Sequence, residues 1–343
     1  MARLSSRKTA AGLFFYTVTF QHILTFDMTT KLAFLFPGQG SQSVGMGKDL
    51  ADNFPVARAT FDEADSALGY KLSQLCFEGP EEKLRLTEIT QPAILTVSVA
   101  AWRMVAEKGL TPAFVAGHSL GEYSAHVAAG TLNFTDAVRT VRNRGKYMQE
   151  AVPVGVGGMA AILGMDLAKV QQICHDAAHG EVCQAANINS PEQIVISGHA
   201  TAVERAVQLA SERGAKKAVT LPVSAPFHCS LMQPAQDRLS TDLNALAFQN
   251  PHVPVACNVD AKLVTSADAS RDALVRQVTG SVRWDESVRL LIGQGVETFI
   301  EIGPGKVLFG LMRQIDRSKK CLTVGDASSL TKTLETLAGG MGD

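Results

Sequence analysis

Short apolar runs alternate with longer amphipathic stretches along the first half of the chain. Residues 32–36 are wholly apolar and end at Pro37-Gly38, and residues 113–116 form a second run of this kind. Such runs, bounded by glycine or proline, predict strands that are buried on both faces. Helical patterns accompany them at 49–67, 81–86, 91–107 (with Pro92 in its first turn), 122–129 and 135–150. This alternation predicts an α/β core around a parallel sheet.

The pattern changes between residues 155 and 221. Strands are predicted at 159–163, 182–187, 193–197 and 218–221, and helices at 166–178 and 201–213. The order β-α-β-β-α-β is typical of a ferredoxin-like unit. We therefore expect a ferredoxin-like subdomain, residues 155–221, inserted into a larger core made of residues 28–154 and 222–337. Further core elements are predicted as strands at 255–259 and 298–302 and helices at 271–279 and 285–294.

Composition narrows the classes of function. Hydrophobic residues make up 46% of the chain and charged residues 19%, with a net charge of −1. A chain this close to neutral has no overall field that would favour nucleic acid or an anionic membrane. The six cysteines include no Cys-x-x-Cys pair, so no zinc or redox motif is visible. A reducing, cytoplasmic setting is the simplest interpretation.

The first 27 residues have an unusual pattern. Arg3, Arg7 and Lys8 precede an apolar run at 10–20, and no acidic residue occurs before Asp27. This resembles a targeting segment, although the apolar run is too short to span a bilayer. The interpretation we favour is that residues 1–27 are a disordered tail or precede the working start at Met28, which leads directly into the first strand.

A serine motif follows the second predicted strand. Gly117-His118-Ser119-Leu120-Gly121 matches Gly-x-Ser-x-Gly, and a helix is predicted directly after it. A strand that turns sharply into a helix exposes the serine at a strained position, and flanking glycines remove Cβ atoms that would clash. Ser119 then lies at a helix N-terminus, where N–H groups stabilise a developing oxyanion. The pattern predicts a hydrolase-like core with a nucleophilic Ser119, against the alternative of a plain glycine-rich turn.

The loop after the first strand is also rich in glycine. The stretch from Phe36 to Gln42 resembles a nucleotide-binding loop, but Ser43 stands where a third glycine would be required and no Gly-Lys-Ser/Thr follows. A strand-end loop can instead supply a backbone N–H to an oxyanion hole. We expect Gln39 to supply one N–H and Leu120 the other; the alternative is a simple tight turn.

A serine nucleophile requires a base. Among eight histidines, His228 lies in a proline-rich loop at the return to the core, where a fixed catalytic group would fit. The side chain of His118, inside the turn, is expected to point away from that of Ser119. No acid stands out as the group that orients the imidazole; Asp260 is the nearest candidate, and a backbone or amide carbonyl would serve equally.

An arginine falls on an apolar helix face. On the helix predicted at 135–150, Arg144 lies between Val141 and Met148, whereas Arg139 and Lys146 lie on the opposite face. A buried cation requires an anion. The partner is either a structural carboxylate or the carboxylate of a substrate, which an arginine binds through two parallel hydrogen bonds.

Taken together, these motifs resemble the malonyl-CoA:acyl carrier protein transacylase family over residues 31–337. Six motifs occur in the family's order, and six in order are far more specific than any one alone. They are Phe34-Leu-Phe-Pro-Gly-Gln-Gly-Ser-Gln42, Gly117-His-Ser-Leu-Gly-Glu-Tyr-Ser124, Arg142-Asn-Arg-Gly-Lys146, Asn187-Ile-Asn-Ser-Pro191, Val223-Ser-Ala-Pro-Phe-His-Cys229 and Ile302-Gly-Pro-Gly-Lys306.

The resemblance implies a role for each matching residue. Ser119 would attack the malonyl thioester, His228 would carry the proton, and the N–H groups of Gln39 and Leu120 would bind the oxyanion. Arg144 would pair with the malonyl carboxylate. Two further residues are implied: the main-chain carbonyl of Gln277 would orient the histidine, and Phe227 would narrow the pocket beside the malonyl methylene.

The resemblance also implies the partners. Malonyl-CoA and acyl carrier protein would be substrates, with no metal or other cofactor, no nucleic acid and no membrane, and the protein would act as a monomer. Carrier proteins are generally acidic, so we expect a basic docking patch at Arg213, Lys216 and Lys217. The alternatives are a serine thioesterase or esterase, a broader-range acyltransferase of polyketide synthesis, and a non-catalytic docking module.

Overall fold

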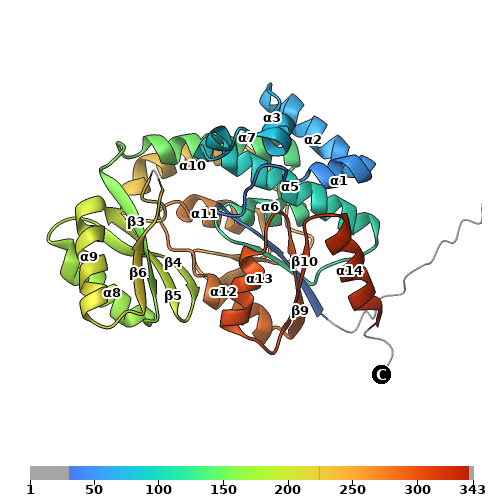
Figure 1. Ribbon diagram of the computed structural model, residues 1–343. Helices are drawn as coiled ribbons and strands as arrows, with labels where there is room; N and C mark the ends of the chain where they lie inside the picture. The colour runs from blue at the N-terminus through green and yellow to red at the C-terminus, as the bar shows by residue number, and fades with distance from the viewer. Residues whose placement is uncertain (1–30, 224, 340–343) are drawn as a thin grey trace, which may run out of the picture.

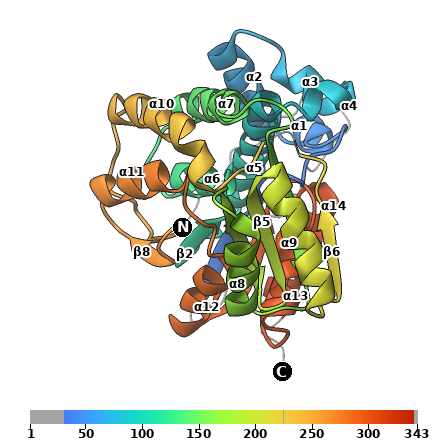
Figure 2. The same cartoon turned by 90° about the vertical axis from the view of Figure 1, so that its left-hand side faces the viewer.

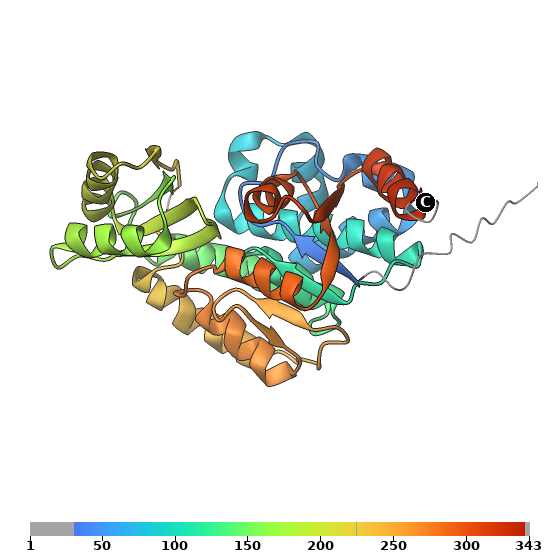
Figure 3. The ribbon, with the colours of Figure 1, turned by 90° about the horizontal axis from the view of Figure 1, so that it is seen from below.

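The computed structural model describes residues 31–223 and 225–339, so the N-terminal segment and the expected start at Met28 lie outside the described residues. The described chain folds into two units that lie side by side (Figures 1 and 3). The larger unit is built on a six-stranded sheet and the smaller on a four-stranded sheet.

The six-stranded sheet has the strand order β10-β9-β1-β2-β7-β8. Neighbouring strands are parallel except β7 and β8, which are antiparallel. The predicted α/β core with a parallel sheet is thereby confirmed. The strands are β1 (Lys31–Phe36), β2 (Phe114–Gly117), β7 (Val255–Cys257), β8 (Lys262–Val264), β9 (Val296–Ile302) and β10 (Lys320–Val324).

Helices cover both faces of this sheet. Phe34 and Phe36 belong to one apolar cluster and Ala33 and Leu35 to another, because successive side chains of a strand point to opposite faces. The second cluster is covered by α12 (Trp284–Gly293) and α13 (Val307–Ile315). The remaining helices of this unit are α1 (Lys48–Asn53), α2 (Pro55–Leu68), α3 (Leu72–Glu78), α4 (Glu81–Leu84), α5 (Thr87–Glu107), α6 (Gly121–Ala128), α7 (Phe134–Glu150), α10 (Gln233–Asn244), α11 (Ala267–Arg276) and α14 (Ala327–Ala338), with the short 3-10 helix η1 (Ser230–Met232) before α10.

Three helix predictions were wrong in their bounds. The single helix predicted at 49–67 is divided at Phe54, because a residue before proline is disfavoured in the α conformation. Helix α5 begins at Thr87 rather than at 91, so Pro92 lies inside the helix and not in its first turn. Helix α11 begins after Ser266, whose side chain caps it, and ends at Arg276 instead of extending to 279.

Helix α5 is also the one helix in the described ranges that is long and apolar enough to cross a membrane. Most of its apolar stretch is buried inside the protein, where it packs against α2 and α7. It is therefore the central helix of the core.

The smaller unit has the predicted order β-α-β-β-α-β. Its strands form an antiparallel sheet in the order β4-β5-β3-β6, and its two helices pack on the sheet over a separate apolar core (Figure 2). The elements are β3 (Gly157–Leu163), α8 (Leu167–Ala178), β4 (Cys183–Ser190), β5 (Gln193–His199), α9 (Ala200–Glu212) and β6 (Lys217–Thr220).

Strand β4 attaches the smaller unit to the larger one. The N–H of Ile188 donates to the carbonyl of Val282, and the N–H of Val282 donates to the carbonyl of Ala186. The Ser190 hydroxyl bonds Gln314 at the end of α13. These contacts hold the smaller unit next to the carboxyl ends of the parallel strands β1, β2 and β7 of the core sheet.

Candidate active site

Ser119 lies at the turn between β2 and α6, with a left-handed backbone conformation (φ 51°). A Cβ atom at Gly117 would come within 2.0 Å of the Gly121 backbone, and one at Gly121 within 2.1 Å of the Phe36 carbonyl oxygen. Only glycine fits at these two positions, so the spacing that singled out the motif has a steric cause. The strained turn presents the Ser119 hydroxyl above the end of the sheet.

The structure brings His228 to this serine. Ser119 Oγ lies 2.7 Å from His228 Nε2, and His228 Nδ1 lies 2.9 Å from the main-chain oxygen of Gln277 and 3.2 Å from that of Gly280. A nucleophile, a base and a group that orients the base are therefore in line. The alternative orienting group, Asp260, was a wrong candidate, because it forms a two-point ion pair with Arg276 instead.

His228 is held in its neutral form. Its side chain is buried, and burial together with the nearby Arg144 cation lowers the pKa of His228 to about 3, although the carbonyls of Gln277 and Gly280 oppose this shift. With Nδ1–H donating to main-chain oxygens, Nε2 is left unprotonated toward the serine. This tautomer can accept the Ser119 proton directly.

Gln39 and Leu120 lie at the ends of adjacent strands. Strands β1 and β2 are parallel with Phe36 opposite Gly117, so residues 37–39 and 118–120 leave the sheet side by side. Close packing fixes the first of these loops, because a Cβ at Gly38 would come within 2.3 Å of the His118 carbonyl oxygen. Within the described residues, neither Gln39 nor Leu120 donates its N–H to a protein acceptor. Both N–H groups are thus available to an oxyanion on Ser119.

Arg144 is buried beside the nucleophile. Only 1% of its surface is exposed, whereas Arg139 and Lys146 of the same helix are exposed, as the helical pattern predicts. Its guanidinium donates to Ser119 Oγ at 3.2 Å, to Gln91 Oε1 at 2.9 Å and to Gln277 Oε1 at 2.9 Å. All three partners are neutral. Across residues 31–223 and 225–339, no acidic side chain forms a direct ion pair with Arg144.

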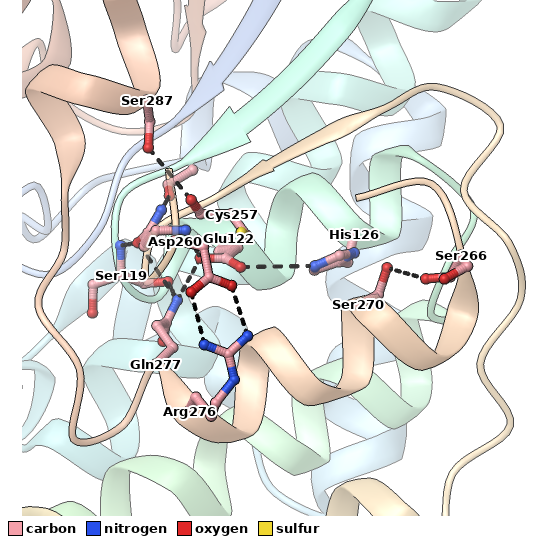
Figure 4. A network of polar contacts seen from close by, with 12 residues as sticks. Ser119, Glu122, His126, Cys257, Asp260, Ser266, Ser270, Arg276, Gln277 and Ser287 are labelled. Carbon is pink, nitrogen blue, oxygen red and sulfur yellow. Dashed lines mark hydrogen bonds and ion pairs between the residues drawn. The ribbon is translucent and has the colours of Figure 1, made fainter. Parts of the chain in front are cut away.

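Three residues of this site were not singled out from the sequence. Gln91, inside α5, accepts from Arg144. Asn258, just after β7, accepts from the Ser119 N–H at 2.7 Å and donates to the Gly117 carbonyl at 2.8 Å, so it clamps the elbow. Glu122 is fully buried in α6 and accepts from the main-chain N–H of Asn258. It also accepts from the side-chain amide of Gln277 (Figure 4). The sequence marked two of these residues only by position, since Asn258 follows a strand and Glu122 follows the serine motif.

The other predicted residues lie as follows. Phe227 is buried next to His228 and packs in the large apolar cluster of the core. His118 points to the smaller unit, where its Nε2 lies 2.7 Å from Asn189 Oδ1. The elbow therefore contacts both units.

The residues of the expected docking patch lie at the end of α9 and the start of β6. Arg213 pairs with Asp176 at 2.6 Å, and Lys216 pairs with Glu192 at 2.8 Å. Lys217 is exposed, and no ion pair to it occurs among the described residues. The patch is therefore less basic than the sequence alone indicated, since two of its three cations have anionic neighbours.

Comparison with known proteins places this arrangement in a family. Residues 33–337 match the family described as acyl transferase domain. The malonyl CoA-acyl carrier protein transacylase of Salmonella typhimurium is 52% identical over 306 residues, which cover 89% of this chain and 99% of that protein. The Bacillus subtilis protein of the same name is 52% identical over 309 residues, covering 90% and 98%.

Solved structures agree in fold. The malonyl CoA-acyl carrier protein transacylase from Coxiella burnetii superposes with a TM-score of 0.88 at 46% identity, covering 90% of this chain and 98% of that one. A malonyl-transacylase in complex with a type II PKS acyl-carrier protein gives a TM-score of 0.88 at 49% identity, covering 90% and 100%. The chain therefore belongs to the acyl transferase domain family.

Proposed function

We propose that this protein transfers the malonyl group from malonyl-CoA to the phosphopantetheine thiol of acyl carrier protein, supplying fatty-acid elongation. The observation that supports this most strongly is the buried guanidinium of Arg144, which lies 3.2 Å from the Ser119 hydroxyl and has no direct anionic partner among the described residues. A malonyl group differs from acetyl by one carboxylate, and a carboxylate bound here would satisfy the cation. The relatives are about half identical in sequence to this chain over nearly their whole length, and their names state the same substrates.

In the first half-reaction, Ser119 Oγ attacks the thioester carbonyl of malonyl-CoA while His228 Nε2 accepts the hydroxyl proton. The tetrahedral oxyanion accepts hydrogen bonds from the N–H groups of Gln39 and Leu120. When the C–S bond breaks, the imidazolium returns its proton to the leaving thiolate of coenzyme A. A malonyl ester on Ser119 remains, with its carboxylate at Arg144.

In the second half-reaction, the phosphopantetheine thiol of the carrier takes the place of coenzyme A. His228 removes the thiol proton, the thiolate attacks the malonyl ester, and the proton passes to Ser119 Oγ as the ester C–O bond breaks. Two half-reactions that share one serine give ping-pong kinetics. The protein itself needs no metal or cofactor for these steps, since the carrier brings the phosphopantetheine.

A serine thioesterase would use the same Ser119 and His228 but would need no carboxylate-binding arginine. A broader-range acyltransferase of polyketide synthesis keeps every residue named above and differs only in acyl tolerance. Arg144 therefore favours transfer of a carboxylated acyl group over plain thioester hydrolysis.

We extend the proposal to the domain organisation of the protein. Residues 155–221 form an inserted ferredoxin-like subdomain, supported by the strand order β4-β5-β3-β6, and residues 28–154 with 222–337 form the catalytic core. The protein works as a monomer in the cytoplasm, where acyl carrier protein is its macromolecular partner.

The proposal is tested by incubating the protein with malonyl-CoA and holo-acyl carrier protein and identifying the products by mass spectrometry. We expect malonyl-carrier as the main product and free coenzyme A in equal amount. Free malonate as the main product would instead establish the thioesterase alternative.

A further inference from the structure

The side-chain amide of Gln277 lies between two buried charges. Its Oε1 accepts from Arg144 Nη2 at 2.9 Å, and its Nε2 donates to Glu122 Oε2 at 2.8 Å and to the Ser119 carbonyl at 2.9 Å. These donors and acceptors fix the direction of the amide, because its oxygen must face the guanidinium and its nitrogen the carboxylate. Figure 4 shows the carboxylate side of this network, with Gln277 reaching both Ser119 and Glu122.

Both charges would be costly without compensation. Glu122 is completely buried and Arg144 is 1% exposed. Glu122 Oε2 also accepts from the N–H of Asn258 at 2.9 Å, but neither of its donors carries a charge. His126, one turn along α6, has its Nε2 4.0 Å from Glu122 Oε1 and has a pKa that burial lowers to about 3, so it is neutral. A buried charge is tolerated only near an opposite charge, and the two charges here are opposite.

We propose that Glu122 is the counter-ion of Arg144, separated from it by the Gln277 amide, and that it thereby limits the preference of the site for carboxylated acyl groups. This inference rests on the proposed function and extends it to a residue that does not touch the substrate. Glu122 acts as a positioning residue through Gln277.

Because the Gln277 amide separates Glu122 from Arg144, the guanidinium stays available to a substrate carboxylate. A carboxylate in direct contact would occupy the two parallel donors that a substrate carboxylate needs. With the anion one amide away, the guanidinium is partly compensated while the site is empty and still gains from a second anion. With Glu122 present, the site binds malonyl less tightly than it would if Arg144 had no counter-ion. Glu122 also lowers the free-energy cost of binding an uncharged acyl group, which leaves Arg144 without a substrate carboxylate.

Glutamine is a close structural substitute at this position. Its amide oxygen can occupy the place of Glu122 Oε2 and keep both donors, Asn258 and Gln277. Its NH₂ then occupies the place of Oε1, which has no hydrogen-bond partner among the described residues and faces a ring nitrogen of His126 that also lacks one. Glu122→Gln thus removes the charge and preserves the hydrogen bonds.

The test compares Glu122→Gln with wild type in steady-state transfer of malonyl and acetyl from their CoA thioesters. Burial raises the pKa of Glu122 to about 7, so the assay is run at about pH 8.5, where this carboxyl is ionised. We expect KM for malonyl-CoA to fall and the malonyl-to-acetyl ratio of kcat/KM to rise by about fivefold or more. An unchanged or lower ratio would overturn the counter-ion role.

Two further variants separate charge from structure. Glu122→Leu removes the acceptor as well, releases the Gln277 amide and should lower kcat for both acyl groups. Glu301→Gln is the matched control, because Glu301 is also buried and accepts two N–H groups, from Leu308 and Phe309, outside the site. It should leave the malonyl-to-acetyl ratio unchanged; a ratio that rises as in Glu122→Gln would refute the inference.

A binding measurement distinguishes this inference from the proposed function. Malonate should raise the melting temperature of Glu122→Gln more than that of wild type, whether or not acyl transfer occurs. If malonate stabilises both proteins equally, the inference fails even where malonyl transfer is observed. If malonyl transfer is absent but malonate discriminates between them, the proposed function fails and the counter-ion role stands.

Discussion

Replacing Arg144 by alanine is the most informative change to substrate selection. The substitution removes a buried guanidinium that donates to Gln91, Gln277 and the Ser119 hydroxyl. It leaves the Ser119–His228 hydrogen bond and the Gln277 carbonyl in place. The chemistry at the serine is therefore retained while the binding of a carboxylate is lost.

The size of the effect follows from burial. Breaking a buried charge pair by removing one partner costs about 3–5 kcal/mol, which corresponds to a loss of about 10² to 10³ or more in kcat/KM for malonyl transfer. An acetyl group has no carboxylate to lose, and in wild type it leaves the guanidinium without an anion in direct contact. Acetyl transfer by Arg144→Ala should therefore be retained or increased. Arg144→Lys should recover little, because an ammonium group cannot replace the forked guanidinium.

The assay is a competition between malonyl-CoA, acetyl-CoA and methylmalonyl-CoA, with the acyl-carrier products identified by mass. Arg139→Ala is the matched control, since Arg139 lies on the exposed side of α7 and bonds the Ala67 carbonyl. It should leave the product ratio unchanged. If Arg144→Ala lowers malonyl and acetyl transfer by the same factor, Arg144 has only a structural role and the reasoning is refuted.

Three further predictions concern the acyl pocket, the carrier and pH. Phe227→Ser should widen the pocket and raise the methylmalonyl-to-malonyl ratio in the same competition; an unchanged ratio would remove Phe227 from the pocket. Reversing Lys216 and Lys217 to glutamate should raise KM for acyl carrier protein and not for malonyl-CoA, whereas equal effects would refute a docking role. Because a base loses activity as pH falls through its pKa, the lowered pKa of His228, about 3, should keep kcat/KM for acetyl-CoA flat from pH 8 down to about 5 in Glu122→Gln, where the carboxyl with a pKa of about 7 no longer titrates. Removing the Arg144 cation from this variant should move the acid limb to higher pH; a limb near pH 6.5 in Glu122→Gln itself would show that His228 is not desolvated.

The parts of the site that depend on local pattern could be predicted from the sequence. The elbow around Ser119 follows from two glycines whose Cβ atoms would clash, and the burial of Arg144 follows from its place on one helix face. Both are determined within a few residues of chain. The same holds for β1, β2, β7 and β9 of the core sheet and for the β-α-β-β-α-β order of the smaller unit, whereas β8 and β10 were not predicted.

The connections between distant segments could not be predicted in this way. The Gln277 side chain bonds the Ser119 carbonyl across 158 residues of sequence, and no local pattern marks that contact. The main-chain carbonyl of Gln277 is free to accept from His228 because it lies at the C-terminus of α11, where carbonyls have no partner within the helix. Similarly, α10 was missed because it buries few apolar side chains on a mostly polar sequence.

The central claim, a malonyl-serine intermediate on Ser119, is tested most directly by mass spectrometry of the protein after incubation with malonyl-CoA alone. The account predicts the addition of one malonyl mass, located on the peptide that contains Ser119 and absent from Ser119→Ala. The carrier protein should then remove the label in a second incubation. Labelling on another peptide, or persistence of the label in Ser119→Ala, would contradict the account.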